Sequence, residues 1–124
     1  MPYKINREDL AWAGGFFDGE GCVSHQYINR TNKDGSKYRN PKIHVSQSGD
    51  TELLEKFKSI VGVGTIREQK SKHLTAKLTR FDYQAGGFEN VQFVVGILWN
   101  FIGTQKKNQA KKVLQRYLNH MRRK

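Results

Sequence analysis

The order of strand-like and helix-like patterns along the chain is its strongest constraint on the fold. Lys37–Gln47 alternates hydrogen-bonding and apolar side chains with the two-residue period of a strand that has one buried face. Cys22–Arg30 alternates similarly, and Thr31–Ser36, which is rich in Asn, Asp, Gly and Ser, separates the two segments. A second strand pair is predicted at Gly64–Lys70 and Leu74–Phe81. The chain is therefore expected to contain two hairpins.

Helical patterns precede, separate and follow these hairpins. One helix is predicted over Asn6–Phe17 and another over Asp50–Gly62, each with its first residue as the cap. A third is predicted over Glu89–Ile102, and Thr104 is expected to cap a fourth. The order α-β-β-α-β-β-α-α predicts an α+β fold in a single domain, residues 1–124. In this fold the helices pack on one face of an antiparallel four-stranded sheet, and the other face is free.

Hydrogen-bonding side chains occupy the predicted free face of the sheet. On the second strand they oppose Ile43, Val45 and Gln47, which share the other face. Ordinary solvent exposure explains most polar sheet faces, but amide, hydroxyl, imidazole and guanidinium groups also read base edges in the major groove of DNA. The residues expected to contact DNA are Ser24, Gln26, Arg30, Tyr38, Asn40, Lys42, His44, Arg67, Gln69, Thr75, Lys77 and Thr79.

The charge of the chain favours the DNA interpretation. Lys and Arg number 22 against 11 Asp and Glu, which gives a formal net charge of +11. Such a surface attracts polyanions, because neutralised phosphates release their counterions. RNA would be attracted equally, so charge indicates the class of partner and not the activity. The single cysteine, Cys22, excludes an internal disulfide and indicates an intracellular protein, in the cytoplasm of a prokaryote or in an organelle. No membrane partner is expected, because the apolar segments are too short to span a bilayer.

The most specific feature is the segment Ala13–Gly21, which reads Ala-Gly-Gly-Phe-Phe-Asp-Gly-Glu-Gly. A glycine inside a helix costs about 1 kcal/mol relative to alanine, so the adjacent pair Gly14 and Gly15 needs a compensating contact. Close approach of a second helix would supply one. Beyond the pair, Asp18 and Glu20 present neighbouring carboxylates, which are suitable ligands for Mg²⁺. The alternative is an ordinary helix and turn that end in glycine.

This segment resembles the motif of LAGLIDADG homing endonucleases in the variant that ends Asp-Gly-Glu-Gly, and the resemblance continues over nearly the whole chain. The single motif is typical of the homodimeric branch of that family. The resemblance implies that Glu20 and the backbone carbonyl of Gly19 bind Mg²⁺ or Mn²⁺, and that Ca²⁺ binds without supporting cleavage. It also implies that Asp18 helps to hold the helix end. The residues expected at the dimer interface are Ala11, Gly14, Gly15 and Asp18.

Two further residues match active-site positions of that branch and complete the expected catalytic set with Glu20. Gln47 is expected to hydrogen-bond a metal-bound water, and Lys106 to offset negative charge that develops at the phosphate. Alternatively, Gln47 is an ordinary amide at the end of a strand and Lys106 is an ordinary solvated lysine. Lys107 is a second candidate for the role of Lys106. The sequence differs from that branch near Asp50, because members of the branch can carry a basic residue shortly after the glutamine.

The motif and the polar face together predict a site-specific endonuclease that acts on double-stranded DNA. The resemblance implies a double-strand break in a long, pseudo-palindromic site, with short 3′ overhangs. Two alternatives with the same fold do not cut: a maturase that binds intron RNA, and a DNA-binding regulator. Ala85–Glu89 echoes the motif without its terminal acid and glycine, and we interpret it as a loop that leads into a helix.

Overall fold

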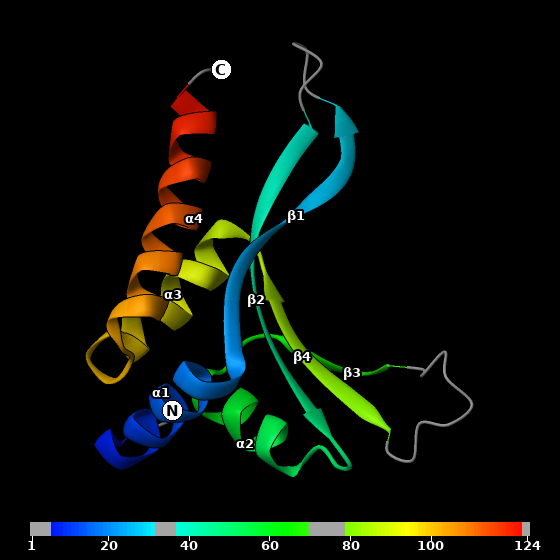
Figure 1. The fold of residues 1–124 in the computed structure, drawn as a ribbon, viewed down its shortest axis with the longest axis vertical. Coiled ribbons are helices and arrows are strands. Elements are labelled where there is room, and N and C mark those ends of the chain that lie inside the picture. The colour runs from blue at the N-terminus through cyan, green and yellow to red at the C-terminus, as the bar shows by residue number, and fades with distance from the viewer. Residues whose placement is uncertain (1–5, 32–36, 70–78, 123–124) are drawn as a thin grey trace.

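The computed structural model describes residues 6–31, 37–69 and 79–122, with the exception of the side chains of residues 27–31 and 37–39. The elements have the predicted order α-β-β-α-β-β-α-α, with a 3-10 turn between the last two helices (Figure 1). No helix in this part of the chain is long and apolar enough to cross a lipid bilayer. The elements are α1 (Arg7–Glu20), β1 (Gly21–Thr31), β2 (Lys37–Ser48), α2 (Glu52–Val61), β3 (Thr65–Gln69), β4 (Arg80–Gly86), α3 (Phe88–Leu98), η1 (Trp99–Phe101) and α4 (Thr104–Arg122).

The four strands form one antiparallel sheet in the order β1-β2-β4-β3. Across the hairpin of β1 and β2, Ser24 pairs with Lys42, and β2 pairs with β4 through His44 and Gln84. The short strand β3 lies on the other side of β4. Figure 1 shows the helices on one side of the sheet, which is curved and open on its other side. The predicted fold class is therefore confirmed.

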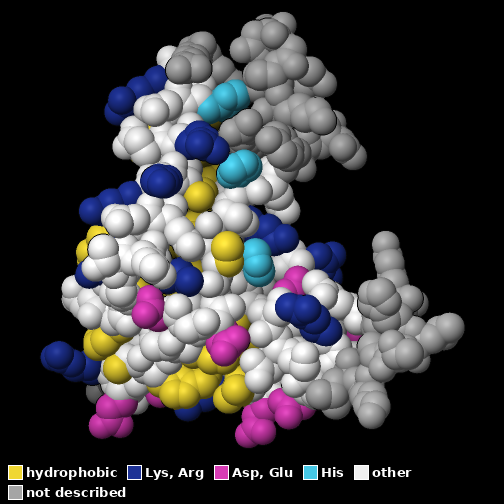
Figure 2. All heavy atoms as spheres, in the orientation of Figure 1, with side chains coloured by type: hydrophobic (Ala, Val, Ile, Leu, Met, Phe, Trp, Pro, Cys, Tyr) yellow, Lys and Arg dark blue, Asp and Glu magenta, His cyan; other side chains and the backbone are white. Residues whose placement is uncertain are grey.

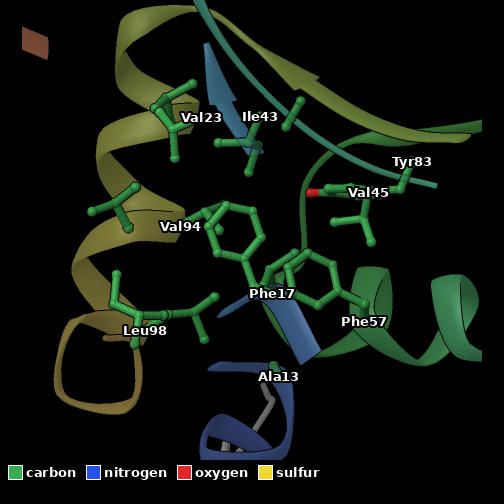
Figure 3. Packing of buried hydrophobic residues seen from close by; sticks show 14 of the residues in the cluster. Ala13, Phe17, Val23, Ile43, Val45, Phe57, Tyr83, Val94 and Leu98 are labelled. Atoms are coloured by element: carbon green, nitrogen blue, oxygen red, sulfur yellow. The ribbon is translucent and has the colours of Figure 1, made fainter. Parts of the chain in front are cut away.

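Alternate residues of the sheet face the helices and form the core. Ile43, Val45 and Tyr83 are fully buried, and Figure 3 shows them on the same side as Phe17 of α1 and Phe57 of α2. The ring centroid of Phe57 lies 5.1 Å from that of Tyr83 and 6.0 Å from that of Phe17. Each large apolar side chain buried in this way contributes roughly 1.5–3 kcal/mol. Because the strands alternate, this core leaves polar side chains on the open face.

The first two helices begin and end close to the predicted residues. The side-chain oxygen of Asn6 accepts a hydrogen bond of 2.7 Å from a backbone N–H in the first turn of α1, as predicted for a cap. In α2 the cap position is Thr51, one residue after the predicted Asp50, whose carboxylate accepts a hydrogen bond of 3.0 Å from the N–H of Glu52. Gly62 ends α2 with a φ of 80°, in the left-handed region that glycine adopts readily.

The predicted bounds of the fourth strand and the third helix are wrong. The described strand β4 runs from Arg80 through Gly86, whereas a strand was predicted over Leu74–Phe81, most of which lies outside the described residues. Burial of alternate β4 residues against the helices keeps the chain extended as far as Gly86. Ala85–Glu89 is therefore not a loop but the end of β4 and the beginning of α3. The third helix ends four residues early, and the chain continues as η1.

Candidate nucleic-acid interface and active site

One side of α1 consists of small residues and faces away from the rest of the described chain. Ala11 and Gly15 are exposed. A Cβ placed on Gly15 or on Gly19 would meet no described atom beyond its own helix within 4 Å. Positions four residues apart lie along one side of a helix, so Ala11, Gly15 and Gly19 form a continuous small-residue strip. Such a strip permits the backbone of a second helix to approach closely.

Gly14 lies on a different side of α1 and packs within the chain. It is buried, and a Cβ at this position would overlap the Cβ of Phe101 in η1 and lie 2.9 Å from the Phe101 carbonyl oxygen. We expected Gly14 at the dimer interface beside Gly15, but η1 of the same chain occupies the space in front of it. Glycine is required at this position because any side chain would push η1 away from α1.

Asp18 links the end of α1 to the beginning of α4. Its Oδ1 accepts a hydrogen bond of 2.8 Å from the backbone N–H of Gly103, the residue that immediately precedes α4. A helix N-terminus carries unpaired N–H groups and partial positive charge, which favour a carboxylate. A Cβ on Gly103 would lie 3.2 Å from this carboxylate, so glycine permits the close approach. The bond thus ties the end of α1, where Asp18 was expected to act, to the residue that precedes α4, and the place of Asp18 at a dimer interface stays a prediction.

Glu20 is the last residue of α1, and its side chain is exposed. The chain enters β1 directly at Gly21, whose backbone N–H donates to the carbonyl of Phe17 and whose lack of a Cβ leaves room for the Phe17 ring. The motif thereby places a carboxylate and the carbonyl of Gly19 at the junction of helix and sheet. In the described part of the chain, no group of three or more His, Cys, Asp or Glu residues could hold a metal ion.

Gln47 and Lys106 come from β2 and α4. Gln47 pairs with Phe81 of β4 and lies with it on the helix side of the sheet, where it is half-buried. Lys106 is half-buried in the first turn of α4. The ammonium group of Lys107 lies 5.2 Å from the ring centroid of Trp99, which is a cation-π contact. This contact favours Lys106 over Lys107 as an active-site residue, and the roles of Gln47 and Lys106 stay predictions.

The register of the sheet brings predicted DNA-contacting residues from three strands onto the open face. Residues directly opposite each other in an antiparallel pair point to the same side, as Gln26 and Asn40 do in β1 and β2. The predicted residues on this side are Ser24, Gln26, Asn40, Lys42, His44, Arg67 and Gln69. Thr79 is exposed and precedes β4. The predicted contacts that lie outside the described residues are Thr75, Lys77 and the side chains of Arg30 and Tyr38.

The sequence interpretation missed the contribution of β4 to this face. It ended the fourth strand at Phe81, although the alternation of polar and apolar residues continues to Ala85 and could have extended the strand. Ser46 on β2 and Thr65 on β3 were also missed. The residues that we call the polar face are Ser24, Gln26, Asn40, Lys42, His44, Ser46, Thr65, Arg67, Gln69, Arg80, Asp82 and Gln84.

Asp82 is a buried acid of the polar face, with 5% of its surface exposed. Its carboxylate accepts hydrogen bonds from Ser46 Oγ at 2.6 Å, from Gln84 Nε2 at 3.0 Å and from Gln69 Nε2 at 3.1 Å. Burial raises the pKa of Asp82, but the hydrogen bonds from Ser46 and Gln84 lower it. Basic side chains of β2 lower it further, so the pKa lies below its ordinary value of 3.8. The carboxyl group is therefore ionised at neutral pH.

The last helix, α4, carries a concentration of positive charge on the helix side of the sheet. This helix packs against β1 and β2 and contains no Asp or Glu. Figure 2 shows Lys and Arg side chains on most of the face in view, including its upper part, whereas the Asp and Glu side chains in view lie in its middle and lower parts. Because α4 lies on the helix side of the sheet, its positive charge adds to the general attraction of a polyanion without belonging to the polar face.

The chain is similar to a known family and to solved structures of homing endonucleases. A family model described as LAGLIDADG endonuclease matches residues 13–117. The homing endonuclease I-CvuI, in complex with the I-CreI target and Mg, is 25% identical with a TM-score of 0.71 over 89% of this chain and 68% of that chain. I-CvuI in complex with its own target and Ca is 26% identical with a TM-score of 0.68 over the same shares. No curated protein sequence matches significantly.

The homing endonuclease I-TnaI has the same fold, with 24% identity and a TM-score of 0.72 over 98% of this chain and 76% of that chain. The family match begins within α1, includes the acid-tipped motif and the whole sheet, and ends within α4. The motif, the order of elements and the open sheet all agree with it. The chain therefore belongs to the LAGLIDADG endonuclease family.

Proposed function

We propose that this chain is a homing endonuclease that binds a long, pseudo-palindromic DNA duplex as a homodimer. It would make a metal-dependent double-strand break with short 3′ overhangs. The observation that carries the proposal is the exposed carboxylate of Glu20, at the tip of a helix with an uncovered small-residue strip. A protein that only binds nucleic acid gains nothing from an exposed acid there, because the acid repels phosphate.

The small-residue strip supports pairing of two copies through α1. Helices that lack intervening side chains approach closely, and a two-fold axis beside the strip would bring the two Glu20 residues together. Ala85–Glu89 does not offer a second motif helix within the chain, because it belongs to β4 and α3. The homodimer would carry a formal net charge of +22, twice the +11 of one chain.

Each copy would bring part of a divalent metal site. The carboxylate of Glu20 and the carbonyl of Gly19 are hard oxygen donors, which fit Mg²⁺, Mn²⁺ and Ca²⁺. Similar structures of I-CvuI were obtained with Mg and with Ca. When bound, such an ion supplies positive charge to the phosphate and lowers the pKa of water. We expect Mg²⁺ or Mn²⁺ to support cleavage, and Ca²⁺ to support DNA binding without cleavage.

Gln47 and Lys106 would assist Glu20 in cleavage. The Gln47 amide is suited to orient the attacking water, and the Lys106 ammonium to stabilise negative charge on the phosphate. The hydrogen bond from Gly103 to Asp18 ties the tip of α1 to the first turn of α4. This bond would keep the relative positions of Glu20 and Lys106 unchanged when DNA binds.

The polar face is the proposed DNA-binding surface. A curved antiparallel ribbon fits the major groove, where the four base pairs present different donors and acceptors. Basic side chains would add contacts to phosphates, which give affinity without sequence preference. The proposed contacts are Ser24, Gln26, Arg30, Tyr38, Asn40, Lys42, His44, Ser46, Arg67, Gln69, Thr75, Lys77, Thr79, Arg80 and Gln84.

Incubation with a pooled library of insertion-site duplexes and Mg²⁺ tests the proposed cleavage. Wild type should cut a subset of the duplexes in both strands. Glu20→Gln should bind the same duplexes but cut them about 100-fold more slowly, because part of the metal site is lost. Glu89→Gln is the matched control, since it neutralises an exposed acid of α3, and it should cut as wild type does.

Two outcomes would replace the nuclease proposal. A wild-type protein that cuts no duplex but binds intron RNA tightly would be a maturase. A wild-type protein that binds a DNA site selectively and leaves it intact with Mg²⁺ and with Mn²⁺ would be a regulator. If wild type does cut DNA and Glu20→Gln cuts it equally fast, the proposed role of Glu20 is contradicted.

A further inference from the structure

An acidic side chain lies within a surface that we propose to bind DNA. The carboxylate of Asp82 accepts hydrogen bonds from side chains on three strands, namely Ser46 on β2, Gln84 on β4 itself and Gln69 on β3. An exposed acid at this position would repel phosphates. Asp82 is instead buried, with 5% of its surface exposed, so its direct effect is on its three partners.

The chemistry of a carboxylate determines how the two glutamine amides are oriented. An ionised carboxylate only accepts hydrogen bonds, so both Gln69 and Gln84 direct an Nε2–H toward Asp82. If either amide were turned over, its Oε1 would face the carboxylate oxygens and be repelled by them. Each amide therefore retains its Oε1 and its second N–H for other partners.

Both glutamines also reach the surface of the polar face. Gln69 is exposed and Gln84 is half-buried, whereas the acid that orients them is covered. The pKa of Asp82 lies below its ordinary value of 3.8, so the carboxylate remains an acceptor at neutral pH. The outward edge of each amide thus has a defined pattern of one acceptor and one donor.

We propose that Asp82 is a positioning residue that orients Gln69 and Gln84 to read adenine in the major groove of the DNA target. The inference rests on the proposed DNA-binding function of the polar face. Adenine presents its N6 amino group as a donor beside N7 as an acceptor, which matches the Oε1 and the second N–H of an oriented glutamine. Guanine presents two acceptors, one of which would face Oε1 unfavourably.

Selection of duplexes from a randomised pool in the presence of EDTA tests the inference without cleavage. Wild type should enrich adenine at two positions of each half-site. Asp82→Asn should reduce this enrichment about 10-fold at both positions. The reduction follows because an asparagine amide both donates and accepts hydrogen bonds, so either glutamine can turn over.

Glu68→Gln is the matched control for charge. Glu68 is an exposed acid of β3 that pairs with Phe81 on the opposite side of the sheet. Its neutralisation removes one negative charge, as Asp82→Asn does, and should raise affinity for all duplexes without a change in base preference. Loss of the adenine preference in both variants would assign the effect to charge and overturn the inference.

Gln69→Ala and Gln84→Ala test the same idea with Asp82 in place, even if Asp82→Asn does not fold. Each variant should lose the adenine preference at one position and keep it at the other. The inference is overturned if the affected positions select another base, or if a folded Asp82→Asn selects as wild type does. Wild type that selects no sequence at all would contradict the proposed function together with the inference.

Discussion

At the scale of single residues, Gly14 and Gly15 are neighbours with opposite surroundings. A Cβ on Gly14 would overlap Phe101, whereas a Cβ on Gly15 would meet no described atom beyond its own helix. The sequence suggested one role for both, because a small residue indicates a close approach but not the element that makes it. Gly14 permits α1 to pack against η1 of the same chain, and Gly15 leaves space for the proposed contact with a second copy.

Substitution of alanine at these two positions should separate the two roles. Gly14→Ala should lower the free energy of unfolding by about 1–3 kcal/mol, because the added methyl group crowds Phe101. Gly15→Ala is the matched control and should be neutral or stabilising by up to about 1 kcal/mol, because alanine favours the helix. Urea unfolding of both variants measures the difference. Equal stabilities would contradict the tight packing of α1 on η1.

At the scale of elements, α1 combines a buried side, an outward strip and an acidic tip. Phe17 is buried in the core, and Glu20 is exposed at the junction with β1. Ala11, Gly15 and Gly19 leave the third side without large side chains. One helix can therefore stabilise the chain and still present a contact surface for a second copy.

Gly15→Leu should separate the proposed dimer and leave the chain folded. The leucine would project from the small-residue strip and prevent close approach of the partner helix, and the monomer has room for it. Sedimentation velocity should then give a monomer, with the circular dichroism of wild type. Gly96→Leu is the matched control, since Gly96 is an exposed glycine of α3 with the same open surroundings. A Gly15→Leu variant that still dimerises would exclude the strip as the interface.

The order of elements follows from the sequence because it depends on local periodicity. The bounds of β4 were missed because Gly86 and Gly87 are typical of a turn, although the alternation of polar and apolar residues from Phe81 to Ala85 already indicates a strand. In the candidate site, the motif made Glu20 recognisable. The cluster around Asp82 was not, because it joins three strands that lie far apart in the sequence. Its hydrogen bonds depend on strand pairing, which no local pattern contains.

At the scale of the whole molecule, basic residues lie on two surfaces that should contribute differently to DNA binding. Lys42 belongs to the polar face, where it pairs with Ser24 across β1 and β2. Lys112 is exposed on α4, outside that face. Net charge attracts DNA from either surface, but only the polar face is proposed to contact base edges.

Lys42→Ala should therefore change both the salt dependence and the base preference of DNA binding. Loss of one phosphate contact reduces the slope of log K against log salt concentration by about 0.9. Lys112→Ala is the matched control and should leave base preference unchanged. Fluorescence anisotropy over a salt series, with duplexes that differ at single positions, measures both quantities. A Lys42→Ala variant that alters the slope alone would assign Lys42 to a phosphate.

The hydrogen bonds to Asp82 also constrain how this surface could evolve toward another target. An apolar residue in place of Gln69 or Gln84 would deprive a covered carboxylate of a donor, at a cost of about 1–3 kcal/mol. A change at either position therefore lowers stability unless Asp82 also changes. We expect that relatives with a different base preference at these positions differ from this chain at Asp82, Gln69 and Gln84 together.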